Sequence, residues 1–600
     1  MVKVINKQQG MSPAFYTSPC VEVLKINVED LLCISGGTEG IGEGTGGWFD
    51  GTEDVVATQN NYSFTMDKED VSLVAKFEKE KMSVGCAGLA KGSFMVGVAG
   101  SAEGMPLEIE TQSGVKSVKV AKLPSGMKYD SKTGKITGAP TKAGKNRVEI
   151  TVTAVSGAVE KREIEIEVAP IPAWAVGTFS GYAVSDDCNG SATMTVGATG
   201  KISGKIVIDG KTWTFSAASY APASSADEML VQATAKSGKE TRMFDSFVRP
   251  GEDAVEGSGL QTAYAGGGVL ESCDVWMYRN VWKDKGAAQY AAKLKGLYTA
   301  RLEGMGSFGY LSIKADAKGG LKATGKLPDG TSVSSSLVLG CDEVAEGTFF
   351  AVWTLTPSSY KGGSVSGRFD FGNETPRQIR GDCLWSNFSP TATDEFGSGF
   401  FEGLGVSGAY YNAGEGLEQH YTELHVALDS PELEVNVKYV DEEEDDSGRV
   451  RKVSHTEREW IGAAASVGGI VRVGAGGKLT IPKAVKPVQD RETKEWYYGD
   501  SEEDNVSALT LSFAKATGIF KGSVTCWYDY MSACDSTKEE GEKYAHTSKK
   551  ISFEGIWVQG QSLAGFYLWD RTGSYWKEKP NGDKVEKTFK YKQSCPVMLE

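Results

Sequence analysis

The stretch from Leu123 to Thr153, LPSGMKYDSKTGKITGAPTKAGKNRVEITVT, decides the fold of its neighbourhood. It opens with a tight turn, because Pro124 fixes φ and Gly126 can adopt a positive φ. Two further four-residue segments that end in Gly, residues 131–134 and 141–144, also predict turns. From Val148 onward, apolar residues alternate with polar ones, which is the period of a half-buried strand. The stretch therefore predicts short strands joined by tight turns.

As a motif, this run resembles an immunoglobulin-like domain family of bacterial surface proteins, with the pattern LPxGLxxDxxTGxIxGxPTxAGxxxxTVTVT. The resemblance implies a cadherin-like β-sandwich over residues 82–169. Its last residues, 162–168, alternate Glu with Ile or Val and predict a final or edge strand with one wet face. The family implies a fold and no particular activity, because such sandwiches carry many unrelated roles.

Composition narrows the class of protein. The chain has 600 residues, which suggests several domains, and 74 of them are Gly, which favours short strands and tight turns. The formal charge of −15 argues against broad nucleic-acid binding, which requires a basic surface. No apolar run of 18 residues occurs, so no transmembrane helix is expected.

The N-terminal region is predicted to be a leader and a Gly-rich linker over residues 1–45. Residues 21–34, VEVLKINVEDLLCI, alternate rather than form the apolar core of a signal peptide, so no signal peptide is recognised. Residues 46–80 contain GWFDG, YSFTM and DVSLVAKF, and they resemble the second half of a divergent internalin B-type repeat. That resemblance implies a small two-strand unit.

Diverged repeats are predicted beyond the linker at 169–172. A strand-turn-strand pattern ending in Asp209-Gly210 recurs at Asp329-Gly330, a shift of 329 − 209 = 120 residues. A longer third copy contains TGIFKG and GFYL, and these runs resemble C-terminal β-repeats of large secreted proteins from Verrucomicrobia- and Lentisphaerae-type bacteria. The predicted domains are 173–290, 293–398 and 399–600. Units of this size favour small barrels or sandwiches over propeller blades, although copies two and three could share one larger barrel.

The ten cysteines include no C-x-x-C pair, so the sequence gives no support to zinc ribbons or thioredoxin chemistry. In an exported chain, their positions suggest three disulfides. These are Cys188–Cys273, Cys341–Cys383 and Cys526–Cys534.

Catalytic and metal motifs are weak. The segment GGSVSG at 362–367 does not have the spacing of a nucleophile elbow. The acidic run DEEEDD at 441–446 does not match the register of a calcium loop, and it predicts a solvated loop between two strands. The cadherin-like resemblance implies calcium for some relatives, but the linker at 169–172 has no Asp. His420 and His425 are expected to be surface or structural residues rather than metal ligands.

Clustered aromatic residues give the better indication of binding. Trp557, Trp569, Tyr575 and Trp576 lie within twenty residues of each other, and aromatic platforms stack on sugar rings and dominate protein hot spots. Trp569 precedes Asp570 and is predicted to lie exposed in a turn. The alternative is that these aromatic residues fill a β core.

Together, these features predict an all-β, multi-domain chain: an immunoglobulin-like β-sandwich followed by repeated antiparallel barrels or sandwiches. The expected function is a non-catalytic, secreted or cell-surface adhesion protein that binds a protein or glycan ligand. One alternative is the glycan-binding ancillary region of a secreted carbohydrate-active protein. Another is a self-assembling structural protein whose edge strands, such as 162–168, pair between chains.

Overall fold

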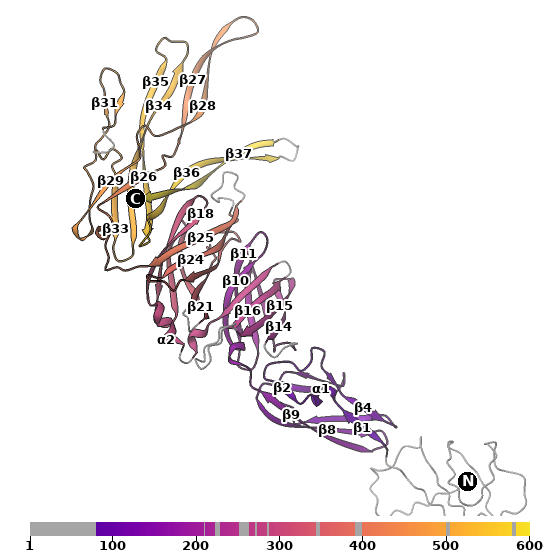
Figure 1. Cartoon of the computed structure of the whole chain (residues 1–600). Helices are drawn as coiled ribbons and strands as arrows, with labels where there is room; N and C mark the ends of the chain where they lie inside the picture. The colour runs from indigo at the N-terminus through magenta and orange to yellow at the C-terminus, as the bar shows by residue number, and fades with distance from the viewer. Residues whose placement is uncertain are drawn as a thin grey trace, which may run out of the picture. The chain divides into compact units, whose positions relative to one another are not determined.

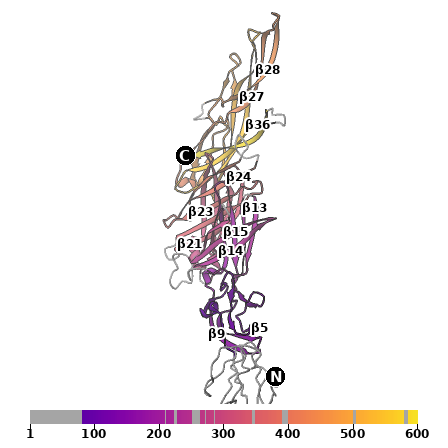
Figure 2. The same cartoon turned by 90° about the vertical axis from the view of Figure 1, so that its right-hand side faces the viewer.

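The computed structural model describes residues 80–208, 210–222, 228–250, 263–270, 273–284, 287–343, 348–389, 399–499, 504–578 and 584–600 (Figures 1 and 2). This part of the chain is mostly β-strand in several sheets, as predicted. It forms two compact units, one built around residues 80–172 with the loops at 197–201 and 218–222, and one holding the remainder. The predicted leader and internalin-type repeat, residues 1–79, lie outside the described residues.

The first unit contains the predicted immunoglobulin-like domain. A four-stranded sheet has the order β2-β9-β8-β5, a three-stranded sheet has the order β3-β7-β6, and β1 pairs with β4. The elements are β1 (Met82–Gly85), α1 (Ala87–Ala90), β2 (Ser93–Met95), β3 (Met105–Pro106), β4 (Glu108–Thr111), β5 (Val115–Ala121), β6 (Met127–Asp130), β7 (Lys135–Gly138), β8 (Gly144–Ala154) and β9 (Val159–Ala169).

The alternation read from the sequence is confirmed. Val148, Ile150 and Val152 of β8 are fully buried in one apolar cluster. Gly126 has φ = 94°, and a Cβ there would lie 2.2 Å from the carbonyl oxygen of Ala139, so the turn requires glycine. As predicted for 162–168, β9 is the last strand of this domain and has one exposed face. It is not an open edge at its C-terminal end, because Glu167 and Val168 pair in parallel with β2.

A buried carboxylate joins three segments of this unit. Glu80 accepts hydrogen bonds from the backbone N–H of Ser113 at 2.8 Å, from the Ser113 hydroxyl at 2.9 Å and from the Ser156 hydroxyl. Burial alone would raise the pKa of Glu80, but the hydrogen bonds from Ser156 and Ser113 outweigh it and lower the pKa below its ordinary value of 4.5.

This lowered pKa predicts acid sensitivity. The ionised Glu80 stabilises the folded unit above the unfolded pKa, and this stabilisation should be lost as the pH falls through and below the ordinary value of 4.5. Urea unfolding at a series of pH values should show that Glu80→Gln is less stable than wild type near neutrality and less sensitive to acid. Glu167→Gln, an exposed position on β9, is the matched control and should follow the wild-type curve. An unchanged curve for Glu80→Gln would contradict this prediction.

The second unit begins with a closed eight-stranded barrel in which β10 pairs with both β11 and β17. Its alternate residues, such as Phe179, Met194, Ile206 and Phe244, are buried, as a filled small barrel requires. The strands are β10 (Gly177–Val184), β11 (Asn189–Val196), β12 (Ile202–Ile208), β13 (Lys211–Ala217), β14 (Met229–Ser237), β15 (Glu240–Pro250), β16 (Ala263–Leu270) and β17 (Asp274–Arg279).

A second closed barrel follows after the short helix α2 (Ala288–Ala291) and is closed by pairing between β18 and β25. Trp353 and Trp385 are fully buried in its core. The strands are β18 (Gly296–Gly304), β19 (Ser307–Ala315), β20 (Gly320–Lys326), β21 (Ser332–Glu343), β22 (Thr348–Leu355), β23 (Val365–Phe371), β24 (Gln378–Asn387) and β25 (Phe400–Tyr410).

The C-terminal domain is an open ten-stranded sheet of order β28-β27-β34-β35-β36-β37-β26-β29-β30, with β33 beside β34. It is therefore a different arrangement from the two barrels. The strands are β26 (Glu423–Leu428), β27 (Leu433–Glu444), β28 (Val450–Ile461), β29 (Gly468–Gly474), β30 (Lys478–Thr480), β33 (Thr510–Ala514), β34 (Ile519–Asp535), β35 (Glu542–Trp557), β36 (Leu563–Glu578) and β37 (Lys584–Leu599), and a separate pair is β31 (Val488–Gln489) with β32 (Trp496–Tyr497).

One local prediction in this domain needs correction. The acidic run at 441–446 is not wholly a loop, because β27 continues through Glu444 and pairs it with Val450 of β28. Only Asp445 and Asp446 lie in the turn, where Asp445 accepts hydrogen bonds from the backbone N–H groups of Ser447 and Arg449. The physical reason is that β27 and β28 pair over twelve residues, and the backbone hydrogen bonds of this pairing outweigh the repulsion among neighbouring carboxylates.

Candidate binding surface

Two of the four aromatic residues predicted as a ligand platform, Trp557 and Trp569, are buried. Trp557 of β35 is 1 % exposed and Trp569 of β36 is 3 % exposed. The Trp569 indole N–H donates to the carbonyl oxygen of Glu432 at 3.1 Å, and the Lys549 ammonium lies 4.0 Å from the centre of its ring. The predicted exposure of Trp569 in a turn is therefore wrong. Tyr575 and Trp576 also belong to β36, and their side chains lie outside the described set.

Trp557 is the centre of an aromatic cluster that fixes the linker between the second barrel and the C-terminal domain, residues 411–422. Its ring makes edge-to-face contacts with Tyr411, His420, Tyr421 and Phe513, with ring centres 5.1–6.4 Å apart. These partners come from the linker and from β33. Trp557 therefore stabilises the core, which was the alternative interpretation of the aromatic pattern.

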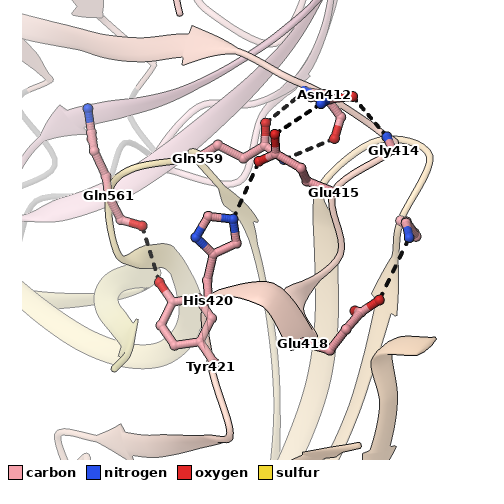
Figure 3. Close-up of polar contacts among 9 residues, drawn as sticks. Asn412, Gly414, Glu415, Glu418, His420, Tyr421, Gln559 and Gln561 are labelled. Atoms are coloured by element: carbon pink, nitrogen blue, oxygen red, sulfur yellow. Dashed lines mark hydrogen bonds and ion pairs between the residues drawn. The ribbon is translucent and has the colours of Figure 1, made fainter. Parts of the chain in front are cut away.

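Polar contacts also fix the same linker (Figure 3). The backbone N–H of Asn412 donates to Gln559 Oε1 at 2.7 Å, and Gln559 Nε2 donates back to the Asn412 carbonyl at 3.0 Å. The Asn412 side chain bonds Glu415 Oε1 at 3.0 Å, and His420 Nε2 lies 3.4 Å from Glu415 Oε2. These contacts hold the linker against the loop that carries Gln559.

The histidines otherwise lie on the surface or against aromatic rings. His425 is 58 % exposed beside Glu423. His546 of β35 is sandwiched between Trp496 and Trp527, with ring centres at 3.7 and 5.2 Å. No group of three His, Cys, Asp or Glu side chains in the described ranges is placed to hold a metal ion.

The structure also corrects two of the three predicted disulfides. Cys526 and Cys534 lie eight residues apart on the single strand β34, so their Cα atoms are about 26 Å apart, whereas a disulfide needs about 4.4–6.8 Å. Cys341 of β21 and Cys383 of β24 are separated by two intervening strands of the second barrel.

The third predicted pair remains a prediction. Cys188 and Cys273 precede Asn189 and Asp274, and both of these residues pair with Val184 at the end of β10. Burial, with a contribution from neighbouring Cys188, raises the pKa of Cys273 to about 12.

Peptide mapping without reduction should therefore find no peptide linking Cys526 to Cys534 and none linking Cys341 to Cys383. The reason is geometric, because neither pair can close without disrupting a β ladder. A sample unfolded under alkylating conditions provides the control for thiol accessibility. Recovery of either linked peptide from folded protein would contradict the described strand register.

Long hairpins extend from the C-terminal domain (Figure 1). In the β27–β28 hairpin, the paired residues run from Leu433 opposite Ile461 to Glu444 opposite Val450. Nearly all of β28 is exposed. The β34–β35 hairpin pairs strands of 17 and 16 residues. On β35, the residues between Ser548 and the turn of the hairpin are exposed or half-buried. We call these two elements the outer hairpins.

Large apolar and aromatic side chains are exposed on or near the outer hairpins. Trp460 is 44 % exposed on β28, Tyr544 is 72 % exposed on β35, and Tyr497 is 69 % exposed on β32. An isolated exposed apolar residue needs no explanation, but exposed aromatic residues carried on extended hairpins are typical of binding surfaces. Sequence reasoning did not single out these residues.

No helix in the described ranges is both long and apolar enough to cross a membrane. Residues 97–169 match the family model described as "Putative Ig domain". A search of curated proteins found no match for the chain. A solved structure of a DUF4784 family protein from Bacteroides caccae ATCC 43185 is similar at 10 % identity, with 64 % of this chain and 95 % of that chain covered and a TM-score of 0.12.

The matched range lies within the first unit, and it does not include the predicted internalin-type residues 46–80. These similarities lend no support to a particular bacterial phylum. The chain contains an immunoglobulin-like domain of a type that is typical of surface proteins.

Proposed function

We propose that this chain is a non-catalytic, secreted or cell-surface binding protein that contacts its ligand through the outer hairpins. The observation that carries the proposal is the exposure of Trp460 and Tyr544 on β strands that extend beyond the apolar core of the C-terminal domain. The immunoglobulin-like domain supports an extracellular location, because such domains are typical of surface proteins.

The arrangement of the second unit supports the same proposal. The second barrel is filled with apolar side chains, so it is suited to act as a rigid support rather than as a container for a ligand. A buried polar cluster of Asn189, Ser364, Ser366 and Ser386 joins the two barrels. A rigid support reduces the entropy that is lost when a displayed surface binds its partner.

Binding of the intact chain to arrays of glycans and extracellular-matrix proteins tests the proposal. Trp460→Ala and Tyr544→Ala should each reduce binding to the positive ligand by about tenfold, the effect expected for hot-spot aromatic residues. Met243→Ala, at a 59 % exposed apolar position on the first barrel, is the matched control and should bind like wild type. Wild-type binding by a chain that carries both Trp460→Ala and Tyr544→Ala would overturn the proposal.

A further inference from the structure

Strands β35 and β36 separate part-way along their length. They pair only from Phe553 to Trp557, opposite Leu563 to Tyr567. Beyond this point, β35 continues to Glu542 with β34 as its partner, and β36 continues to Glu578 with β37 as its partner. The two hairpins visibly diverge in Figure 1. The result is a fork in the sheet.

Each arm of the fork has one open edge. From Ser552 outward, β35 has no strand partner on its β36 side among the described residues, and the same is true of β36 from Leu568 outward on its β35 side. Backbone N–H and C=O groups on an open edge are a template for another strand. Adding an extended peptide to such an edge is a recurring mode of recognition.

A cleft of about 220 Å³ lies at the vertex of the fork, and we call it the fork cleft. Lys549, Lys550 and Ser552 line it from β35, Leu568 and Asp570 line it from β36, and Lys326 lies at its base. Lys326 is paired with Glu554. Lys549 contacts the Trp569 ring, and neither Lys549 nor Lys550 makes an ion pair with a described carboxylate. The β35 side of the fork cleft therefore favours an acidic partner.

We propose that residues 21–30 of a second copy of this chain, VEVLKINVED, add as a strand to the open edge of β35 at the fork cleft. The segment alternates apolar and polar residues, which is the pattern of a strand. Its three acidic residues against one Lys give it a net charge of 1 − 3 = −2, which complements Lys549 and Lys550.

The length of chain around this segment also suits the proposal. Between Asp30 and Glu80, the first described residue, there are 80 − 30 − 1 = 49 residues. Extended, such a linker spans up to about 160 Å, so reaching a neighbouring molecule is not limited by length. Donation from one copy to the next is a heterologous contact, which produces rings or open chains. The proposal uses strand edges and does not depend on the ligand-binding role of the outer hairpins.

Sedimentation velocity of the full chain and of a variant lacking residues 1–34 tests self-association. The full chain should associate as its concentration rises, and the truncated chain should remain monomeric. A labelled peptide of residues 19–34, with C20S and C33S, should bind the truncated chain. The same peptide with I26P should bind at least about tenfold more weakly, since Pro removes a ladder N–H.

Charge reversal locates the contact. K549E with K550E in the truncated chain should weaken peptide binding by about tenfold or more, whereas K584E with K587E, at exposed positions on β37, should not. Circular dichroism should show that all four substituted positions leave the fold intact. A monomeric full chain, or peptide binding that is unaffected by K549E with K550E, would overturn the proposal, even if the outer hairpins bind a ligand as proposed above.

Discussion

Replacing Trp557 with Ala should lower the free energy of unfolding of the C-terminal domain by about 3–5 kcal/mol, the range for removing a buried aromatic side chain. The Trp557 ring packs against Tyr411, His420 and Phe513, so the substitution leaves a cavity where the linker meets β33 and β35. The Trp557 carbonyl also accepts a hydrogen bond from Thr299 of the second barrel at 2.9 Å. Loosening this point should therefore weaken the attachment of the domain as well as its core.

Urea unfolding followed by circular dichroism measures this effect. Tyr544→Ala is the matched control, because it removes an aromatic side chain from the exposed end of the same strand, and it should change stability by no more than about 0.5 kcal/mol. If Trp557→Ala abolished ligand binding and left the unfolding curve unchanged, the assignment of Trp557 to the core would be wrong, and the platform interpretation would be restored.

Replacing Asn189 with Ala should destabilise the two-barrel body by about 3 kcal/mol, because several buried polar groups lose their partners at once. The Asn189 amide donates to the Leu384 carbonyl at 2.7 Å and to the Ser366 hydroxyl at 2.8 Å, and its oxygen accepts from Ser386 at 2.5 Å. Asn189 lies on β11 of the first barrel, and its partners lie on β23 and β24 of the second.

Differential scanning calorimetry of the intact chain is the appropriate measurement, since it resolves whether the barrels unfold together. In wild type, they should share one transition, and Asn189→Ala should lower its midpoint or split it in two. Thr195→Ala, at an exposed position on the same strand, should leave the transition in place. An Asn189→Ala transition identical to that of wild type would show that the polar cluster does not couple the barrels.

Much of the fold could be predicted because its signals are local. The turns around Gly126 and the alternation from Val148 to Val152 depend on backbone sterics and on the two-residue period of a strand, and the structure confirms both. Both barrels belong to the predicted all-β class. The open sheet of the C-terminal domain could not be recognised, because barrel closure depends on pairing between the first and last strands, which the spacing of turns does not encode.

The candidate site was less predictable because burial is a non-local property. Trp569 precedes Asp570 and lies four residues before Gly573, which suggested a turn. In the structure, Gly573 sits opposite Phe589 within one continuous ladder. The residue that accepts the Trp569 N–H, Glu432, is 137 positions away in the sequence. The aromatic residues of a β core and those of a binding face have the same alternating pattern, so only the tertiary packing distinguishes Trp557 from Tyr544.

Protease treatment of intact native cells, followed by mass spectrometry of the released peptides, most directly tests the central claim that this chain displays its outer hairpins outside the cell. The account predicts early release of peptides from residues 441–452 and 535–543, while peptides from the two barrels appear only after lysis and unfolding. Recovery of the protein solely from the cytoplasmic fraction, with no peptide released from intact cells, would contradict the account.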